Sequence, residues 1–380
     1  MLLLTLKTYS MVTKESIQAV KDRMDIVDVV SSFIKLDRNN KACCPFHAEK
    51  SPSFQVSAKR QTYKCFGCGV GGDTIAFVMN HERLDFMEAI EWLANRYNIV
   101  LEIKEESEAD KKKRDQAKDV IGTLNKAIEF AYYHYHKALI TGNRDTNQAW
   151  KYLKDRGISE ETALSWGFGF APEEWQFLST PIINVDLFTP AETVGLVKSK
   201  EGKVYDFYRN RLIIPIHNAH GQLIGIAGRW IPTGDKEKDQ LQGKYINPNE
   251  SPIYKKRSTW FGLYQALIAK AFTKDKHGVV PPAFIVEGYL DVISMHESGI
   301  PNTVASSGTA ITIDQIRILK KYTSHFVLFT DGDASGQNAA LKTIDLCLQE
   351  NIRVDVIELP EGEDPDSYSK KYLLTEAAAS

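Results

Sequence analysis

The sequence predicts a multidomain protein of mixed α+β and α/β class, in which a small cysteine-rich domain precedes a larger core. Three observations predict this order. Four of the five cysteines lie between residues 43 and 68, a highly charged segment covers 102–119, and short apolar strands alternate with helical stretches after residue 280. At about 150 residues per domain, 380 residues leave room for two or three domains.

The first domain is expected over residues 14–100. Residues 14–36 and 86–94 carry apolar side chains at helical spacing. Asp73 or Thr74 is placed to cap another helix between them. This domain is therefore small and largely helical around its cysteines.

Residues 101–119 offer little apolar surface to bury, so they form either a flexible tether or an exposed helical spacer. The first part of the core is expected over 120–275. It contains the aromatic-rich stretch 130–136, which we interpret as a packed helix. Two apolar runs, 212–216 and 223–227, flank a short polar turn and predict a β-hairpin.

The second part of the core is expected over 276–370. Its short apolar strands are separated by helical stretches, which is typical of an α/β domain with a mostly parallel sheet. The predicted strands are 283–286, 303–305, 326–329 and 354–357. Cys347 lies in a helical run and is expected to be core.

Composition excludes several classes of protein. No apolar run reaches the roughly 18 residues of a membrane span, and the apolar start is too short for a secretion signal. An odd total of five cysteines, four of them clustered, favours a metal site in a reducing cytoplasm over disulfides. We therefore expect a soluble cytoplasmic protein.

The net charge of −2 hides a local asymmetry. Residues 200–257 hold eleven basic and six acidic side chains, whereas residues 281–368 hold five basic and fourteen acidic ones. A basic region followed by an acidic one suggests a track for a polyanion that leads to a cation-binding centre.

Two Cys/His pairs predict a metal site. Each pair has two residues between its members, and residues 48–64 separate the pairs. Three thiolates and one imidazole complete a tetrahedron around one structural Zn²⁺ and leave no position for water. The predicted ligands are Cys44, His47, Cys65 and Cys68. Cys43 is the second choice for the first position.

Cations and aromatic side chains alternate near the second pair, which suits a surface for nucleic acid. The residues are Lys59, Arg60, Tyr63, Lys64 and Phe66. The alternative is a zinc scaffold that contacts only its own domain.

Acidic residues follow three of the predicted strands. Glu287 ends one strand, with Asp291 a helical turn further on, and Asp331 and Asp333 end another. The carboxyl ends of parallel strands meet at one edge of a sheet. Glu287, Asp331 and Asp333 are therefore expected to converge on Mg²⁺, with the acidic cluster 363–366 extending the site.

The acidic motifs at 287–291, 331–336 and 362–366 resemble those of the Toprim fold. The cysteine segment 44–73 resembles that of bacterial replicative DNA primases of the DnaG type, and the order of the motifs matches that family. The resemblance covers residues from about 14 to 370, including a basic ridge between the two sites. It implies a zinc-ribbon N-terminal domain followed by a primase catalytic core containing a Toprim α/β domain.

The resemblance implies template-directed synthesis of short RNA primers on single-stranded DNA from ribonucleoside triphosphates, in the bacterial cytoplasm at the replication fork. Two or more Mg²⁺ or Mn²⁺ ions would activate the 3′-hydroxyl for attack on the α-phosphate. It assigns catalysis to Glu287, Asp331 and Asp333, and adds Asp291, Asp364 and Asp366 as metal ligands. It assigns template and nucleotide phosphates to Arg156, Arg209, Arg211, Arg229, Lys244, Tyr245 and Lys256.

Family members continue into a helical domain that docks onto the replicative helicase, whereas this sequence stops at Ser380. The chain is either a fragment or a short primase of a mobile element, so helicase docking is not inherited. Two alternatives stay open, namely a Toprim-type nuclease and a non-catalytic single-stranded-DNA-binding replication accessory protein. A type IA topoisomerase needs large additional domains for which the chain has little room.

Overall fold

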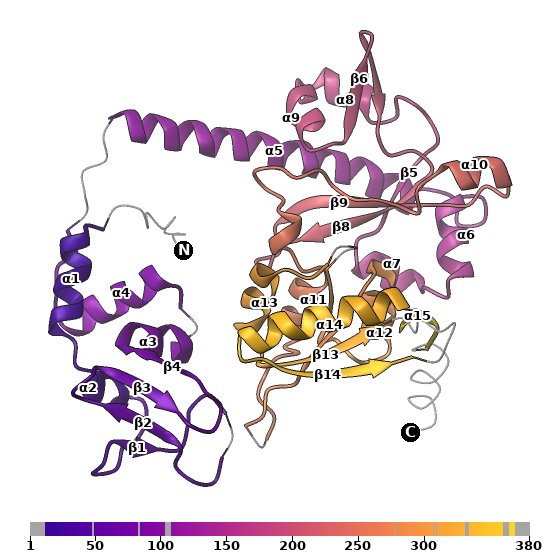
Figure 1. The fold of residues 1–380 in the computed structure, drawn as a ribbon. Coiled ribbons are helices and arrows are strands. Elements are labelled where there is room, and N and C mark those ends of the chain that lie inside the picture. Colours follow the sequence, from indigo (N-terminus) through magenta and orange to yellow (C-terminus); the bar gives the residue numbers. More distant parts are fainter. Residues whose placement is uncertain are drawn as a thin grey trace. The chain divides into compact units, whose positions relative to one another are not determined.

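The computed structural model describes residues 12–47, 49–82, 84–102, 108–276, 278–306, 308, 310–330, 334–359 and 365–368 (Figure 1). It divides into two compact units. We call residues 1–114 with 274–280 the cysteine-rich unit, and residues 115–273 with 281–380 the core unit. None of the helices among the described residues is both long and apolar enough to cross a membrane.

The cysteine-rich unit packs four helices against a four-stranded antiparallel sheet of order β1-β2-β3-β4. Its elements are α1 (Lys14–Arg23), α2 (Ile26–Ser31), β1 (Lys41–Ala42), β2 (Phe54–Ser57), β3 (Thr62–Cys65), β4 (Gly71–Asp73), α3 (Thr74–Glu82) and α4 (Phe86–Arg96). Their apolar faces share one core that includes Phe54 and Phe77, both fully buried.

Side-chain caps decide where the helices of this unit begin. The helical pattern over 14–36 is split into two helices, because the Asp25 side chain accepts the N–H groups of Val27 and Asp28 and starts α2. The expected cap at residue 73 is confirmed, since Asp73 accepts the Ala76 N–H at 2.8 Å.

The first part of the core unit is built around a four-stranded antiparallel sheet of order β10-β9-β8-β5. Its strands are β5 (Gly169–Ala171), β8 (Arg211–His217), β9 (Leu223–Trp230) and β10 (Tyr245–Ile246), with a separate hairpin of β6 (Val197–Lys200) and β7 (Lys203–Asp206). The predicted hairpin at 212–227 is confirmed as β8 paired antiparallel with β9.

Helices surround this sheet. They are α5 (Glu108–Ile140), α6 (Gln148–Asp155), α7 (Glu160–Ser165), α8 (Ser179–Asn184), α9 (Phe188–Thr193), α10 (Lys236–Leu241), the 3₁₀ turn η1 (Lys256–Ser258) and α11 (Leu263–Ile268). The aromatic stretch 130–136 lies in α5, where Tyr135 is fully buried, so the packed-helix interpretation is confirmed. Residues 108–119 form the first turns of the same helix.

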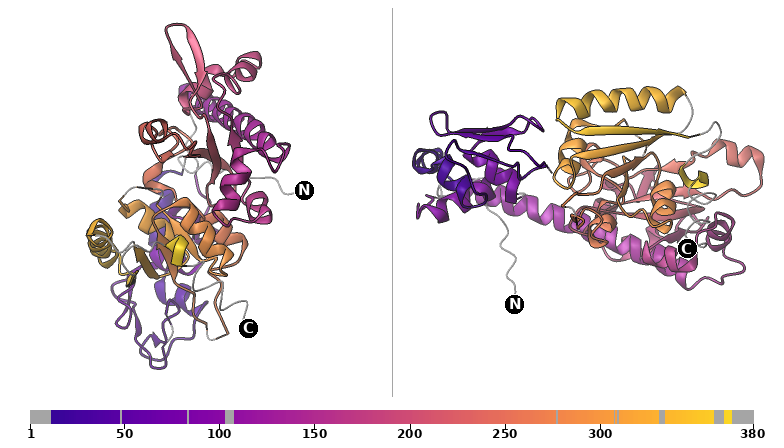
Figure 2. Two further views of the ribbon diagram at one scale, coloured as in Figure 1. Left: turned by 90° about the vertical axis from the view of Figure 1, so that its right-hand side faces the viewer. Right: turned by 90° about the horizontal axis from the view of Figure 1, so that it is seen from below.

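The second part of the core unit is a parallel sheet of order β12-β11-β13-β14. It comprises β11 (Ala283–Val286), α12 (Tyr289–Glu297), β12 (Thr303–Ala305), α13 (Ile313–Lys320), β13 (His325–Thr330), α14 (Ala334–Gln349), β14 (Arg353–Glu358) and α15 (Pro365–Tyr368). Figure 2 shows α14 along one face of this sheet. The predicted α/β domain is confirmed, and Cys347 is fully buried in it.

Candidate metal centre and nucleic-acid interface

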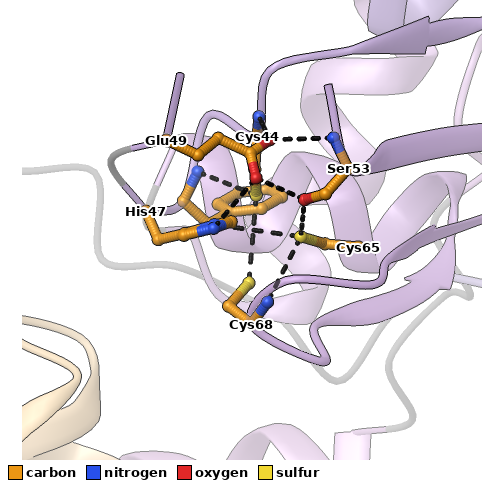
Figure 3. A network of polar contacts seen from close by, with 7 residues as sticks. Cys44, His47, Glu49, Ser53, Cys65 and Cys68 are labelled. Carbon is orange, nitrogen blue, oxygen red and sulfur yellow. Dashed lines mark hydrogen bonds and ion pairs between the residues drawn. The ribbon is translucent and has the colours of Figure 1, made fainter. Parts of the chain in front are cut away.

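The structure brings the four predicted zinc ligands together. The ligand atoms of Cys44, His47, Cys65 and Cys68 all lie within 4.8 Å of one another (Figure 3). Two of the sulfurs, those of Cys44 and Cys68, are 3.9 Å apart. A tetrahedral Zn²⁺ with Zn–S bonds of about 2.3 Å needs sulfurs about 3.8 Å apart. The donor set and its spacing therefore fit one zinc ion, whereas Cys43 is exposed and outside the cluster.

Close packing of the loops holds these ligands in place. A Cβ at Gly67 would lie 2.8 Å from His47 Nε2 and 2.8 Å from Ser53 Oγ, so a side chain there would displace both. The backbone N–H of Cys68 donates to Cys65 Sγ at 3.4 Å, and that of Phe46 donates to Cys44 Sγ at 3.4 Å. Such amide donors stabilise thiolates.

The thiols differ in their electrostatic environment. Burial raises the pKa of Cys44 and of Cys68. Burial also acts to raise the pKa of Cys65, but hydrogen bonds from Ser53 and from backbone amides outweigh it and lower that pKa. A coordinated cation would deprotonate all three thiols.

A carboxylate lies against this cluster. Glu49 accepts the N–H of Cys44 at 2.7 Å and the N–H of Ser53 at 3.1 Å, and it also accepts the Ser53 hydroxyl. Its Oε2 lies 3.2 Å from His47 Nε2. The Ser53 hydrogen bond is the main cause that lowers the pKa of Glu49.

The expected nucleic-acid surface beside the cluster is only partly exposed. Phe66 is 73% exposed, and Lys64 is exposed with its Nζ donating to Gly69 O at 2.6 Å. The prediction of a surface role is wrong for Tyr63. Side chains alternate along β3, so that of Tyr63 points into the core, where it is 2% exposed and its hydroxyl accepts a hydrogen bond from Asn80. Lys59 and Arg60 are exposed in the turn before β3.

We call the carboxyl ends of β11 and β13, at Val286 and Thr330, the carboxylate edge of the core unit. Glu287 directly follows β11 and is exposed. Asp291, in the first turn of α12, accepts the Gly288 N–H at 2.8 Å. Strand β13 pairs in parallel with β11, so the end of β13 at Thr330 lies at the same edge of the sheet as Glu287.

Four further aspartates were predicted to join this site. Asp331, Asp333 and Asp364 lie outside the described residues. Asp366 lies within α15, but its side chain lies outside the described atoms. Their assignment stays a prediction.

Two arginine side chains lie against aromatic rings in the first part of the core unit, and we call this group the cation–aromatic cluster. The Arg229 guanidinium lies 4.8 Å from the Tyr245 ring and 6.0 Å from the Tyr152 ring. The Arg156 guanidinium lies 5.5 Å from the Tyr152 ring. Arg229 and Tyr152 are buried, at 7% and 8% exposed, whereas Arg156 and Tyr245 are half-buried. Burial raises the pKa of Tyr245, so the ring stays neutral beside the arginine.

The other basic residues divide into exposed and buried ones. Lys244 is exposed, and Arg209 and Lys256 are half-buried. Arg209 stacks 3.8 Å from the ring of Trp175, which is 61% exposed. Arg211 is only 2% exposed, and its guanidinium donates to the carbonyls of Gly228 and Gly243.

Burial lowers the pKa of Arg211 to about 10. The guanidinium stays charged at neutral pH while two backbone carbonyls satisfy it. This environment favours a supporting role beneath the surface over a direct phosphate contact.

Tyr289 joins the cation–aromatic cluster to the carboxylate edge. It begins α12 directly after Glu287 and Gly288, its hydroxyl donates to Asn247 Oδ1 at 2.8 Å, and its ring lies 5.4 Å from that of Tyr245. The charge of Asp291 also contributes to the raised pKa of Tyr245. The basic and acidic halves of the core unit therefore meet at this point.

Sequence reasoning missed Glu49, Ser53, Asn247 and Tyr289 as individual contributors. Glu49 and Ser53 lie inside the predicted cysteine segment, and Tyr289 lies inside an acidic motif. Nothing in their spacing distinguishes them from neighbours, because their roles depend on contacts across loops and sheets.

Three family descriptions match the chain in order. They are CHC2 zinc finger over residues 12–109, DNA primase catalytic core, N-terminal domain over 134–267, and Toprim-like over 284–369. The DNA primase of Clostridium acetobutylicum is 38% identical over 366 residues, which cover 95% of this chain and 57% of that protein.

Solved structures give the same result. The Aquifex aeolicus primase, solved as its zinc-binding and RNA polymerase domains, is 32% identical, with 96% of this chain and 84% of that chain covered at a TM-score of 0.57. A DnaG primase catalytic domain bound to single-stranded DNA is 28% identical, with 69% and 81% covered at a TM-score of 0.60. The chain spans little more than half the length of the curated relatives it matches.

Proposed function

This chain belongs to the family of bacterial DnaG-type DNA primases, and we propose that it synthesises short RNA primers on a single-stranded DNA template. The observation that carries the proposal is the contact at Tyr289. There a cluster of arginines and aromatic rings, in which Arg156 and Tyr245 are half-buried, meets the end of β11 and the exposed carboxylate of Glu287. A similar catalytic domain was solved with single-stranded DNA bound, which supports this choice of template.

We propose that the carboxylates hold two divalent cations, Mg²⁺ or Mn²⁺. When bound, these ions supply charge neutralisation at the transferred phosphoryl group and lower the pKa of the attacking hydroxyl. The described donors are hard oxygens at the carboxyl end of a parallel sheet, which fits such ions. The proposed holders are Glu287, Asp291, Asp331, Asp333, Asp364 and Asp366.

The chain's own residues bind and orient the two substrates. Arg209, stacked on exposed Trp175, is placed to contact template, and Lys244 and Lys256 are placed to contact template or triphosphate. Half-buried Arg156 presents a cation over the ring of Tyr152, whereas Arg229 is only 7% exposed and lies over the ring of Tyr245. Arg211 supports this surface from beneath.

The cysteine-rich unit binds one structural zinc ion. We propose that it assists template recognition through exposed Phe66 and its neighbouring lysines. The domain boundaries we propose are 14–100 for this domain, 101–119 for the linker, 120–275 for the basic part of the core and 276–370 for the Toprim part.

The test is incorporation of labelled ribonucleotides on mixed-sequence single-stranded DNA with Mg²⁺ or Mn²⁺. Asp331→Asn keeps the shape of the side chain and removes its charge, so primer yield is expected to fall about a thousandfold. Asp345→Asn, an exposed residue of α14, is the matched control and is expected to leave the yield unchanged.

Other outcomes would contradict the proposal. Cleavage of DNA without ribonucleotides would favour a Toprim-type nuclease. Template binding without any synthesis, equal in wild type and Asp331→Asn, would favour a non-catalytic accessory protein.

A further inference from the structure

We propose that Glu49 is a positioning residue that orients His47 toward the zinc ion and thereby sets the zinc affinity of this chain. The inference goes beyond the proposed function, because it concerns the metal site of the cysteine-rich unit and is tested without primer synthesis. It stands on the contacts around one carboxylate (Figure 3).

The two ring nitrogens of His47 face different partners. Nδ1 lies 3.8 Å from Cys65 Sγ, on the side of the sulfur cluster, and Nε2 lies 3.2 Å from Glu49 Oε2. An imidazole that ligates zinc through one nitrogen carries its proton on the other, and that N–H needs an acceptor. Glu49 Oε2 is the carboxylate oxygen in contact with Nε2, and under this proposal it takes the N–H and so selects the tautomer in which Nδ1 is free to bind the metal.

The same carboxylate ties the ligand loops together. Oε1 accepts the backbone N–H of Cys44 and that of Ser53, at 2.7 and 3.1 Å. The Ser53 hydroxyl donates to Oε2 and lies 3.1 Å from Cys65 Sγ. Three of the four ligands therefore reach Glu49 directly or through Ser53.

A carboxylate at this place has an electrostatic cost that its contacts must offset. Three thiolates around one Zn²⁺ leave a net charge of about −1, so a further anion nearby is repelled. The Glu49 side chain is nevertheless only 11% exposed. Three donors from Cys44 and Ser53 hydrogen-bond to it and His47 Nε2 lies 3.2 Å away, which is the arrangement expected of a carboxylate that orients a metal-binding histidine.

Glu49→Gln separates the histidine contact from the backbone contacts. The amide oxygen can still accept the N–H groups of Cys44 and Ser53, but the amide nitrogen then faces His47 Nε2 as a second donor. Zinc affinity of the full chain, measured by competition with a chromogenic chelator, is expected to fall about tenfold. Equal affinity in Glu49→Gln and wild type would overturn the proposal.

The matched control is another neighbouring His/Glu pair in the same unit. Glu82 lies 2.8 Å from His81 Nδ1, away from the ligand cluster. Glu82→Gln is expected to change zinc affinity by less than about twofold, since a carboxylate orients a metal ligand only when it touches that ligand. A tenfold loss in this variant would show that removing any negative charge from this unit weakens zinc binding, and would contradict the proposed role.

A double-mutant cycle distinguishes orientation of the histidine from support of the loops. His47→Cys keeps four ligands but removes the imidazole, so adding Glu49→Gln is expected to change affinity by less than about twofold. If the tenfold loss persists in that background, the effect acts through the loops and the proposal fails. Absorbance of the Co²⁺-substituted chain checks that each variant still offers a tetrahedral sulfur-rich site.

Discussion

The two sites of this chain are assembled over very different lengths of sequence. In the cysteine-rich unit, all four ligand side chains fall between residues 44 and 68, and short loops hold them within 4.8 Å of one another. In the core unit, Glu287 shares an edge with the end of β13 only because β11 and β13 pair in parallel. A local site depends on its metal for stability, whereas a site at a sheet edge depends on the packing of the whole unit.

Metal removal tests this difference with the largest expected effect. Binding of a structural zinc contributes about 10 kcal/mol or more, so Cys65→Ser or a strong chelator should unfold the cysteine-rich unit. Hydrogen exchange followed by mass spectrometry should show lost protection in β2, β3 and α3, while β8, β9 and β11 keep theirs. Cys347→Ala is the control, because this buried thiol lies in the core unit. Retained protection in β2 and β3 without metal would refute a metal-dependent fold.

Arg211→Ala tests whether packing supports the basic surface. Removal of the buried guanidinium leaves the carbonyls of Gly228 and Gly243 without these donors, which should cost about 3 kcal/mol in the free energy of unfolding. Urea unfolding of the full chain measures this loss.

Arg209→Ala provides the contrast, since Arg209 stacks on an exposed ring. It should change the free energy of unfolding by less than about 0.5 kcal/mol. It should weaken template binding and lower the slope of log K for binding against log salt concentration by about one. If the two variants exchanged these effects, the division into buried and surface arginines would be wrong.

Acid should weaken the core unit through His296. Burial lowers the pKa of His296 to about 4, against 6.5 for the ordinary side chain. Between these values the unfolded chain binds a proton that the folded chain does not, so stability falls as the pH falls below 6.5. The loss between pH 7 and pH 5 should be about 2 kcal/mol.

Urea unfolding at the two pH values measures this loss, and His296→Gln should reduce the difference between them. An unchanged pH dependence in that variant would assign the acid sensitivity to other groups.

Tyr289→Phe is the smallest change and tests the junction of the two halves of the core. Only the hydroxyl that donates to Asn247 is lost, and the ring contacts with Tyr245 and Phe261 remain. One hydrogen bond corresponds to about 1 kcal/mol, so kcat/KM for primer extension should fall by up to about tenfold, with little change in the free energy of unfolding. Tyr322→Phe, in the turn after α13 where the ring packs near Phe272, is the control and should retain full activity.

The sequence by itself determined which four side chains form the Cys/His cluster, where the hairpin of β8 and β9 lies, and which segments form the strands of the parallel sheet. These features depend on local spacing: short knuckles place thiolates together, and apolar runs with turn residues between them form strands. Residues 44–68 and 212–227 illustrate both cases.

Only the tertiary structure decided which neighbours each side chain meets. Tyr63 is buried because β3 turns it inward, Arg211 is covered by the strands around it, and Glu49 meets His47, Cys44 and Ser53 through folded loops. Burial and hydrogen-bond partners depend on segments distant in the chain, and residue type and spacing do not specify those contacts.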